Sequence, residues 1–377
     1  MVAISRPLII DTTLRDGEQM PGVCFSPERK MELAQRIADF GAGVIEVMPV
    51  VSPSEQEVAK KLSAMRFKSE LRAVCRLKRE DIELSASTGV ERLLLVAPVS
   101  DLHLKVKFGI GREEGLNKLL ESVDFACSHC GKIDVALEDA SRADPDYLLR
   151  ISDSLSGRIS LLLIGDTLGV LTPFTTRSLI RRLKSRPRPC RLEFHGHNDF
   201  GMAVANTVSA ISAGADAFTA TFCGIGERAG NAAMEEVVVA LKFLEGIDAG
   251  VEFGEIASIC RQVAESISVQ IHPNKPWAGS NAFTHESGIH ADAVLKDPGT
   301  YEAFPPETVG QERRILFGKK TGRHALERLL RENGMSFSPM DLVALRELVK
   351  GITQTNGAPF TPLEIIRLFE GTRYGTQ

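Results

Sequence analysis

The sequence predicts a TIM (β/α)8 barrel, followed by an irregular segment and a small helical C-terminal subdomain. Short apolar runs typical of buried parallel strands alternate with amphipathic helical stretches over the first part of the 377-residue chain. Eight such units fit into about 250 residues, which is the number and the length of a TIM barrel. The alternative, a doubly wound open sheet, would more often carry a glycine-rich phosphate turn after its first strand, where this chain has TLRDGEQ.

Eight strands are expected in order along this part of the chain. They cover 8–14, 43–49, 70–76, 92–98, 133–139, 159–167, 191–198 and 217–224. Helices are expected between them, for example at 27–40 and 231–244, where apolar residues recur with helical spacing. Pro27 and Pro173 suit the first turn of a helix, with Ser26 and Thr172 as the capping residues before them.

The composition changes after residue 250. One more helix is expected at 254–268, followed by a stretch rich in Gly, Pro, Asn and His that holds the single Trp of the chain. This stretch is interpreted as an irregular functional segment, and helical patterns return from residue 322. The predicted division is a catalytic barrel at 1–255, a helix and crossover segment at 256–318, and a helical subdomain at 319–377.

The overall composition excludes several classes of protein. The net charge is −4, from 45 basic and 49 acidic residues, which favours neither a nucleic acid nor a membrane surface as partner. No run approaches the ~18 apolar residues of a membrane span, and the N-terminal apolar patch is too short for a signal peptide, so a cytoplasmic location is expected. The seven dispersed cysteines indicate reduced thiols, and Cys127 and Cys130 lack the second ligand pair of a structural zinc site.

Polar and ionisable residues follow the ends of most predicted strands. In a TIM barrel the carboxyl ends of the strands carry the active site. The residues at these ends are Arg15, Asp16, Glu18 and Gln19, then Arg76, then Glu138 and Asp139, then Asp166 and Thr167, then His195, His197, Asn198 and Asp199, and finally Glu227, Arg228 and Asn231. The sequence therefore predicts a polar site on one rim of the barrel.

A metal site is the main candidate on this rim. His195 and His197 are two residues apart, so on a strand both side chains point to the same face. Together with the carboxylate of Asp16 they form a set that suits Mg²⁺, Mn²⁺, Zn²⁺ or Fe²⁺ and leaves positions open for substrate. The alternative is two histidines satisfied by hydrogen bonds in the core. Arg15 is either a cation over a substrate carbonyl or carboxylate, or one half of an ion pair in the barrel mouth.

Six segments then resemble a known family, the acyltransferases that include the 2-isopropylmalate, citramalate and homocitrate synthases. The resemblance spans nearly the whole chain. The segments are DTTLRDGEQMPG (11–22), GDTLG (165–169), HGHND (195–199), GIGERAGNAAMEE (224–236), HESGIHADAVLKDPGTYEAF (285–304) and FGKKTGRHAL (317–326).

The resemblance implies a TIM barrel with a divalent metal, Mg²⁺ or Mn²⁺ in preference to Zn²⁺. It implies a Claisen condensation of acetyl-CoA with a 2-oxo acid, after which the thioester is hydrolysed and CoA is released. On this pattern Asp16, His195 and His197 hold the metal, and Asn231 lies near it or binds it through water. Arg15 binds the keto oxygen and Thr167 the carboxylate of the 2-oxo acid.

The resemblance also implies a catalytic pair that the partner subunit of a homodimer contributes. His290, assisted by Tyr301, is similar to this pair, and the segment 270–310 would cross over to the other subunit. A His is the natural base for the acetyl methyl group, because its pKa is near neutral. Gln19 and Glu138 share the rim and complete the set as candidate substrate-binding and catalytic residues.

The acceptor substrate is expected to be 2-oxoglutarate. Homocitrate synthases of lysine biosynthesis carry an R-F-S-x-E-D motif on the fifth strand, where this chain has DVALED with Asp134 and Ala136, and a His on the third strand, where it has Arg76. Because a buried carboxylate needs a cation, the hypothesis is that Arg76 binds the distal carboxylate of 2-oxoglutarate. The segments VCRL (74–77), APVSDLHLKVKFG (97–109) and EDASRAD (138–144) resemble the homocitrate synthases that serve assembly of the nitrogenase iron–molybdenum cofactor.

Several alternatives stay open at this point. A 2-isopropylmalate or citramalate synthase without the C-terminal regulatory domain typical of those enzymes is one, and a homocitrate synthase of lysine biosynthesis is another. A lyase of the same barrel family would run carbon–carbon chemistry in reverse, but such lyases generally lack the HESGIHADAV segment found here. A non-catalytic binding protein is less expected, because Asp16, His195, His197 and His290 are all present.

Overall fold

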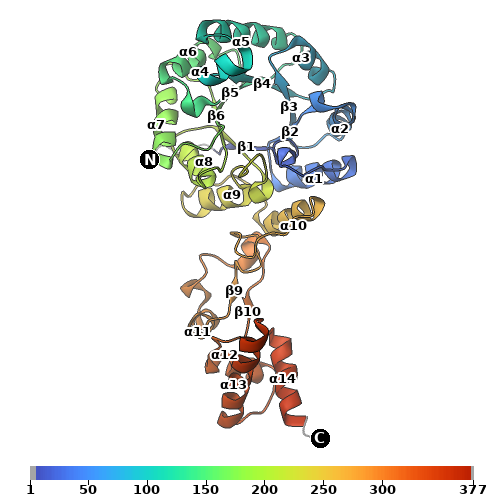
Figure 1. The fold of residues 1–377 in the computed structure, drawn as a ribbon, viewed down its shortest axis with the longest axis vertical. Helices are drawn as coiled ribbons and strands as arrows, with labels where there is room; N and C mark the ends of the chain where they lie inside the picture. The colour runs from blue at the N-terminus through green and yellow to red at the C-terminus, as the bar shows by residue number, and fades with distance from the viewer. Residues whose placement is uncertain (1–5, 375–377) are drawn as a thin grey trace. The chain divides into compact units, whose positions relative to one another are not determined.

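The computed structural model describes residues 6–374, which fall into two compact units with a boundary between Gln270 and Ile271 (Figure 1). The helix expected at 254–268 is observed as α10 (Ile256–Ser266), and it belongs to the first unit. The three-part division at 255 and 318 stays a prediction.

The first unit is a closed barrel of eight parallel strands in sequence order, with β1 paired to β8, so the predicted TIM barrel is confirmed. Helices surround the ring of strands (Figure 1). The strands are β1 (Leu8–Asp11), β2 (Val44–Val47), β3 (Glu70–Arg76), β4 (Arg92–Pro98), β5 (Ile133–Glu138), β6 (Leu161–Asp166), β7 (Leu192–Gly196) and β8 (Ala217–Ala220).

The helices of the barrel begin where the sequence places their caps. The Ser26 side chain accepts a hydrogen bond from the Arg29 N–H, and Thr172 forms a capping box with Thr175. The helices are α1 (Pro27–Phe40), α2 (Pro53–Ala64), α3 (Arg79–Ala86), α4 (Asp101–His103), α5 (Arg112–Cys127), α6 (Pro145–Leu155), α7 (Pro173–Lys184), α8 (Ala203–Ser212), α9 (Met234–Phe243) and α10.

An ion network lies inside the barrel. The Arg72 guanidinium on β3 is fully buried and donates to carboxylates of Glu46 on β2 (2.6 Å), Glu193 on β7 (2.6 Å) and Asp134 on β5 (3.2 Å). Arg92 on β4 binds the same Asp134 with two hydrogen bonds, of 2.9 and 2.7 Å. Because an unpaired buried charge is costly, loss of any one of these five charged side chains would leave its partners uncompensated.

An apolar layer lies closer to the carboxyl ends of the strands than the ion network does. Four buried side chains form it, Val74, Leu94, Ala136 and Leu163, from the consecutive strands β3 to β6. Met48 and Val96 pack against this layer.

Asp11 on β1 makes the stability of the barrel depend on pH. Burial raises the pKa of Asp11 to about 7, although Thr13 donates hydrogen bonds of 2.9 Å to both carboxylate oxygens. The folded chain therefore holds a proton that the unfolded chain, with an Asp pKa of about 3.9, releases. Stability is consequently lost as the pH rises from about 4 through 7.

Replacement of Asp11 by Asn should remove this contribution, since the amide is neutral at every pH and its oxygen can still accept from the Thr13 N–H. Urea unfolding at a series of pH values is the measurement. Relative to the wild type, the variant is expected to gain stability between pH 5 and 8, by a few kcal/mol at most. Parallel curves for the two proteins would contradict the assignment.

Over residues 271–374, the second unit contains a two-stranded parallel sheet and four α-helices. The elements are β9 (Thr284–His285), α11 (Gly288–Lys296), β10 (Arg314–Ile315), α12 (Arg323–Glu332), α13 (Pro339–Asn356) and α14 (Pro362–Tyr374). A separate apolar core, with Phe317, Leu326, Leu345 and Phe369 among its members, holds the helices together and confirms the predicted helical subdomain.

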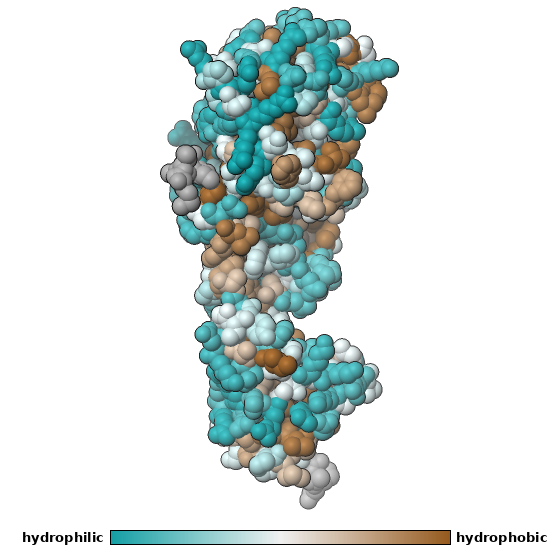
Figure 2. Space-filling model, turned by 90° about the vertical axis from the view of Figure 1, so that its left-hand side faces the viewer, coloured by the Kyte–Doolittle hydropathy of each residue, from teal (hydrophilic) through white to brown (hydrophobic). Residues whose placement is uncertain are grey.

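The face of the chain shown in Figure 2 carries both hydrophilic and hydrophobic residues. Hydrophilic residues predominate on the face in Figure 2, with smaller hydrophobic areas between them. Between residues 6 and 374, the structure has no helix with the length and apolar character that a membrane crossing requires.

Candidate metal and substrate site

A cavity of about 460 Å³ opens where the strands of the barrel end. Most of the residues predicted for the site line it, namely Arg15, Asp16, Gln19, Arg76, Glu138, Thr167, His195 and His197. Asn231 is buried beside the cavity, in a backbone bridge with His197. The two remaining candidates, His290 and Tyr301, belong to the second unit.

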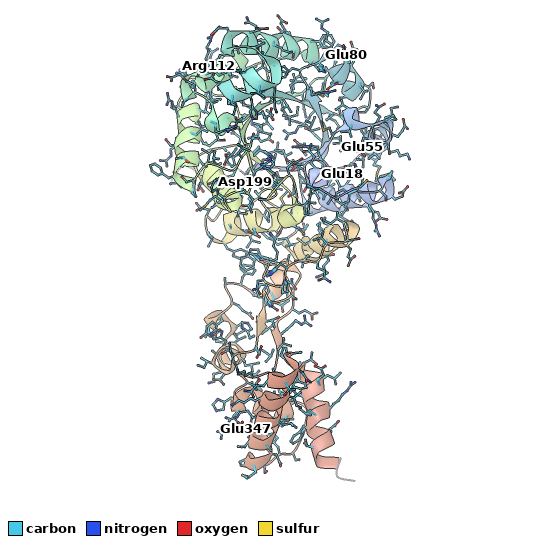
Figure 3. All side chains as sticks on the ribbon, viewed as in Figure 1. Glu18, Glu55, Glu80, Arg112, Asp199 and Glu347 are labelled. Carbon is cyan, nitrogen blue, oxygen red and sulfur yellow. The ribbon has the colours of Figure 1, made fainter. Side chains whose placement is uncertain are left out.

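The loop after β1 gives the site its first two side chains. The strand ends early because the Arg15 and Gly17 N–H groups both donate to the Thr12 carbonyl, which turns the chain. Glu18 then fixes the loop, since its carboxylate accepts from the buried Lys30 ammonium (2.5 Å), which also binds Glu55 (2.6 Å). Figure 3 labels Glu18 and Glu55. Glu18 follows the first strand, as the sequence predicted, but its carboxylate forms an ion pair that stabilises the loop.

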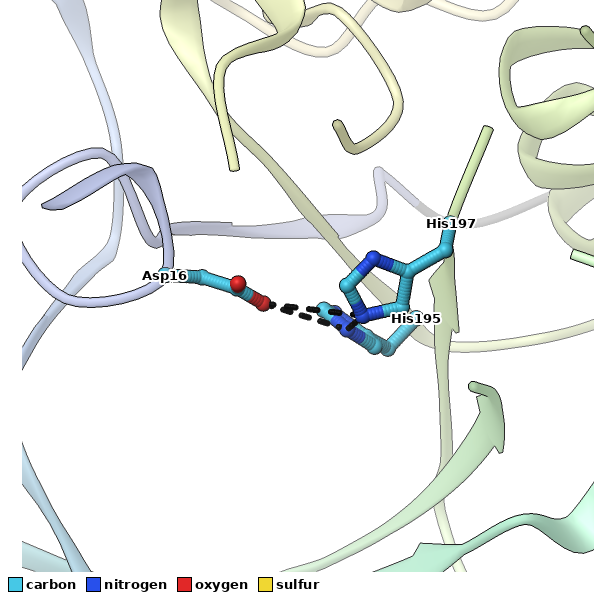
Figure 4. Close-up of side chains that lie close together, drawn as sticks. All are labelled: Asp16, His195 and His197. Carbon is cyan, nitrogen blue, oxygen red and sulfur yellow. Dashed lines mark hydrogen bonds and ion pairs between the residues drawn. The ribbon is translucent and has the colours of Figure 1, made fainter. Parts of the chain in front are cut away.

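Three potential ligand atoms face one another in the cavity (Figure 4). The Nε2 atoms of His195 and His197 are 3.1 Å apart, and they lie 3.4 and 3.9 Å, respectively, from Oδ2 of Asp16. Two ligand atoms bound about 2.1 Å from one ion at neighbouring corners lie about 3 Å apart. Two of the three separations, 3.1 and 3.4 Å, are close to this value, and the third, 3.9 Å, is longer. The three atoms are thus near enough to surround one divalent ion, with the remaining positions open.

The hydrogen bonds around these atoms also fit a metal. Asp16 is only 1% exposed, and neither of its carboxylate oxygens accepts a hydrogen bond of regular geometry, although Nη1 of Arg15 lies 3.1 Å from Oδ2 as an ion-pair partner. The Thr219 hydroxyl donates its proton to the Phe194 carbonyl (3.4 Å), so its oxygen accepts a hydrogen bond from Nδ1 of His195 (2.7 Å). The proton of the neutral imidazole is therefore on Nδ1, and the lone pair of Nε2 is available to a metal. Buried polar atoms without partners are rare in proteins, and an ion at this position would satisfy them.

The protonation states suit the same purpose. Burial, and after it the charge of His197, lowers the pKa of His195 to about 3. Burial also lowers the pKa of His197. For Asp16 burial acts to raise the pKa, but the charges of Arg15 and the two histidines outweigh it and lower the value to about 2. At neutral pH the triad consists of two neutral imidazoles and a carboxylate, the forms that bind metal.

Asn231 lies next to the triad because of two glycines in its loop. A side chain at Gly226, where φ is +153°, would place its Cβ 2.2 Å from Nδ2 of Asn231. A Cβ at Gly230 would meet the Gly224 carbonyl oxygen at 2.0 Å. Asn231 donates from Nδ2 to the Ile225 carbonyl (3.1 Å), and its buried Oδ1 has no partner. That oxygen is available to a metal or to a water bound to one.

Arg15 is held in place by a residue absent from the sequence-based candidates. Nε and Nη2 of Arg15 lie 2.7 and 2.6 Å from Oε2 of Glu46, and Nη1 lies 3.1 Å from Oδ2 of Asp16. Glu46 also binds Arg72, so it connects the cavity to the ion network of the barrel. The available signal was a single carboxylate inside the apolar strand GVIEVMP, which must find a cation when buried.

The other walls of the cavity carry charged groups with partners. Arg228 donates to Asp199 (2.8 and 3.0 Å), a residue labelled in Figure 3, and to the Thr167 carbonyl (2.6 Å). Arg76, whose side chain is 59% exposed, donates from Nε and Nη2 to Asp81 (2.5 and 2.9 Å). The predicted Arg76 therefore reaches the cavity as one half of an ion pair, and its Nη1 has no partner among residues 6–374.

Two further candidates have defined surroundings. The Thr167 Oγ1 accepts from the Asp139 N–H (2.8 Å), which leaves the hydroxyl proton for another acceptor. Gln19 is exposed at the cavity, with its Oε1 3.4 Å from Nη1 of Arg15.

In the second unit, His290 and Tyr301 lie together. Their ring centroids are 4.0 Å apart, with 31° between the ring planes, and both side chains are exposed on the unit. The neighbouring Glu302 is buried and accepts two hydrogen bonds from Arg313 (2.7 and 2.6 Å), which fixes the backbone beside Tyr301. An imidazole and a phenol in contact form a candidate pair for proton transfer.

The fold and the site define a TIM barrel with a candidate metal triad, and comparison with known proteins identifies the family. A family model described as HMGL-like matches residues 6–263, and one described as "Homocitrate synthase post-HMGL domain-like" matches residues 278–356. The chain belongs to the HMGL-like family, within the group whose members are named as citramalate, 2-isopropylmalate and homocitrate synthases.

Three relatives illustrate the range of names. The chain is 42% identical to a putative (R)-citramalate synthase of Methanothermobacter thermautotrophicus, over 91% of this chain and 69% of that protein. It is 39% identical to the homocitrate synthase of the same organism (92% and 88% covered) and 39% identical to a 2-isopropylmalate synthase of Methanocaldococcus jannaschii (88% and 64% covered). These relatives support the family and do not single out one 2-oxo acid.

Solved structures agree on the fold. The HMG-CoA lyase of Pseudomonas aeruginosa matches with a TM-score of 0.63 at 22% identity, covering 77% of this chain and 98% of that one. The HMG-CoA lyase of Bacillus subtilis matches with a TM-score of 0.62 at 22% identity, covering 71% and 95%. At this identity the similarity concerns the barrel alone.

Proposed function

We propose that this protein is a homocitrate synthase, which condenses acetyl-CoA with 2-oxoglutarate and hydrolyses the thioester to give homocitrate and CoA. The observation that carries the proposal is the distribution of charge around one cavity. Arg15 and Asp16 follow β1, and the two histidines lie at the end of β7. Arg76 ends β3, which is two strands from β1 and four strands from β7 in the closed ring. A 2-oxo dicarboxylic acid has two carboxylates, one next to the ketone for the region of Arg15 and the triad, and a distal one for the region of Arg76. The relative named as a homocitrate synthase supports the reaction class.

The residues of the chain divide the chemistry between them. A divalent metal on Asp16, His195 and His197 supplies Lewis-acid polarisation of the ketone when it is bound. Arg15, fixed by Glu46, places a guanidinium where negative charge develops on the keto oxygen. Thr167 donates its free hydroxyl proton to the carboxylate next to the ketone.

His290, beside Tyr301, takes a proton from the acetyl methyl group in this proposal. The resulting carbanion attacks the ketone carbon, a carbon–carbon bond forms, and the keto oxygen becomes a hydroxyl by taking up a proton. Water then adds to the thioester carbonyl, and CoA leaves as the thiol. The site is completed in a homodimer.

The apolar layer gives a reason to keep a second candidate. Val74, Leu94, Ala136 and Leu163 all line the cavity and would suit a 2-oxo acid with an aliphatic side chain, as expected for a 2-isopropylmalate or citramalate synthase. For 2-oxoglutarate the same layer would accommodate the two methylene groups. The link to nitrogenase cofactor assembly rests on the resemblance of residues 74–77, 97–109 and 138–144.

The test is release of CoA, followed with a thiol reagent, from acetyl-CoA and each of 2-oxoglutarate, 2-oxoisovalerate and pyruvate in the presence of Mg²⁺ or Mn²⁺. The proposal expects the highest kcat/KM with 2-oxoglutarate, together with homocitrate as the identified product. A clear preference for 2-oxoisovalerate or pyruvate would favour the second candidate, and no release with any of the three would reject the reaction class.

Replacement of Arg76 by Ala is expected to raise the KM for 2-oxoglutarate by about tenfold or more and to leave the KM for acetyl-CoA nearly unchanged. The reason is loss of a charge-assisted hydrogen bond from the free Nη1 edge to the distal carboxylate. Arg79→Ala is the matched control, because Arg79 begins α3, packs over Phe125 and does not line the cavity. Equal effects on both substrates would contradict the role of Arg76.

A further inference from the structure

The segment between β4 and α5 contains an unusual helix. After α4, residues Leu104–Phe108 form a π-helix that ends at Gly109 with φ +68°. Single π-helical turns are rare and frequently occur at functional sites. Two residues at the end of this turn, Lys107 and Phe108, line the cavity, so the turn brings a cation to the proposed site.

The two ends of the segment are fixed. Arg112, labelled in Figure 3, donates to both carboxylate oxygens of Asp101 (2.6 and 2.7 Å) and so closes the base of the loop. Leu104 is buried against Gly115 of α5, where a Cβ would lie 2.7 Å from Cδ2 of Leu104. The π-helical turn is therefore held over the cavity by its flanking contacts.

Lys107 has an ion pair that leaves donors free. Its Nζ lies 2.5 Å from Oε1 of Glu138, which also lines the cavity and whose Oε2 lies 3.7 Å from Nδ1 of His103. An ammonium group has three N–H donors, and this contact uses one of them. Without Lys107, the charge of Glu138 would repel a second carboxylate in the cavity. With Lys107 present, the two remaining N–H groups of its ammonium can donate hydrogen bonds to an anion beside Glu138.

We propose that Lys107 is a specificity-determining residue, whose ammonium group bridges Glu138 and the distal carboxylate of a 2-oxo dicarboxylic acid. This inference rests on the proposed function and assigns the second anionic contact of the acceptor substrate. Lys107 follows β4 and Arg76 ends β3, so the two cations reach the cavity from neighbouring strands. The apolar layer of β3 to β6 lies under both of them and takes the methylene groups of the substrate.

The other cavity cations suit this role less well. Arg15 is bound by Glu46 and Asp16, and Arg228 donates to Asp199 and to the Thr167 carbonyl. Lys78 also lines the cavity and, within residues 6–374, has no carboxylate partner. No contact directs its exposed ammonium group, whereas Glu138 directs that of Lys107.

The experiment compares Lys107→Met with Lys105→Met. Lys105 lies in the same π-helical turn, is exposed and does not line the cavity, so it is a matched control. Steady-state CoA release is measured with 2-oxoglutarate and with 2-oxoisovalerate. For Lys107→Met, the KM for 2-oxoglutarate is expected to rise by about 10- to 100-fold. The KM for acetyl-CoA should stay within about twofold of the wild-type value, as should the KM for 2-oxoisovalerate if the wild type uses that substrate. Lys107→Arg should recover most of the loss.

Three outcomes would overturn the inference. The first is an equal KM for 2-oxoglutarate in the Lys107→Met and Lys105→Met proteins, with the wild type active on that substrate. The second is a rise in that KM for Lys78→Met but not for Lys107→Met. The third is a wild type that uses monocarboxylic 2-oxo acids only. Failure of the proposed function is distinguishable, because it appears in the wild type as no CoA release with any 2-oxo acid, or as release with monocarboxylic 2-oxo acids only. The first two outcomes overturn the role of Lys107 while the wild type remains active on 2-oxoglutarate.

Discussion

Replacement of Asp16 by Asn is expected to lower kcat for CoA release at least about 1,000-fold and to abolish tight binding of Mn²⁺. Asp16 is the one anionic member of the triad, and the low pKa of its carboxyl, about 2, keeps it charged at every physiological pH. The amide keeps the size of the side chain but removes its charge, so two neutral imidazoles alone face the ion. Lewis-acid polarisation is worth several kcal/mol of barrier, which corresponds to the expected loss.

Two measurements check this prediction independently. Titration with Mn²⁺, followed by calorimetry or by the paramagnetic signal of the ion, reports binding without turnover. Treatment of the wild type with a chelator should abolish CoA release, and added Mg²⁺ or Mn²⁺ should restore it. Neither ion should restore Asp16→Asn to the wild-type rate.

Asp199→Asn is the control for Asp16→Asn. Asp199 lies in the loop after β7, the strand that carries His195. Its carboxylate is bound to Arg228 and does not belong to the triad. The variant should keep Mn²⁺ binding and lose less than about tenfold in kcat, since a partly exposed ion pair contributes little. If Asp16→Asn bound Mn²⁺ as tightly as Asp199→Asn does, the triad would not be the metal site.

The TIM barrel could be predicted from the sequence because strand and helix patterns alternate, and because the number of strand patterns is the eight that such a barrel requires. The ends of strands were less predictable, since local hydrogen bonds decide them. The first strand was expected to reach residue 14, but β1 ends at Asp11, where the Asp11 carboxylate takes the Thr13 N–H and the chain turns at the Thr12 carbonyl. Likewise β8 ends at Ala220, before Cys223 adopts φ +62°. Hydrophobicity patterns carry no information about such turns.

The rim residues of the site were predictable for a geometric reason. Parallel strands all end at the same edge, so residues that follow strands converge wherever the strands lie in the sequence. Glu46 and Arg72 were not predictable in this way, because they lie in the middle of strands buried on both faces, where alternation does not distinguish the interior of the barrel from the helix side. Lys107 lies in a π-helical turn, which has no regular sequence pattern.

Replacement of His290 by Ala is expected to lower kcat at least about 1,000-fold, with metal binding unchanged. In the proposed mechanism this imidazole, which is in contact with the ring of Tyr301, removes the methyl proton of acetyl-CoA. The triad is untouched, so Mn²⁺ titration should match the wild type. This result separates His290 from Asp16, whose replacement should remove both activity and binding.

A mixture of the two inactive variants tests whether His290 acts on the barrel of another subunit. Asp16→Asn and His290→Ala chains that assemble together at equal amounts give half mixed dimers. If each site combines the barrel of one chain with His290 of the other, every mixed dimer has one intact site, and about one quarter of the wild-type activity should return. If barrel and His290 come from the same chain, no site is intact in any dimer and activity stays at the level of the single variants. Light scattering of the wild type supplies the control, because a monomer would also show no recovery of activity in the mixture.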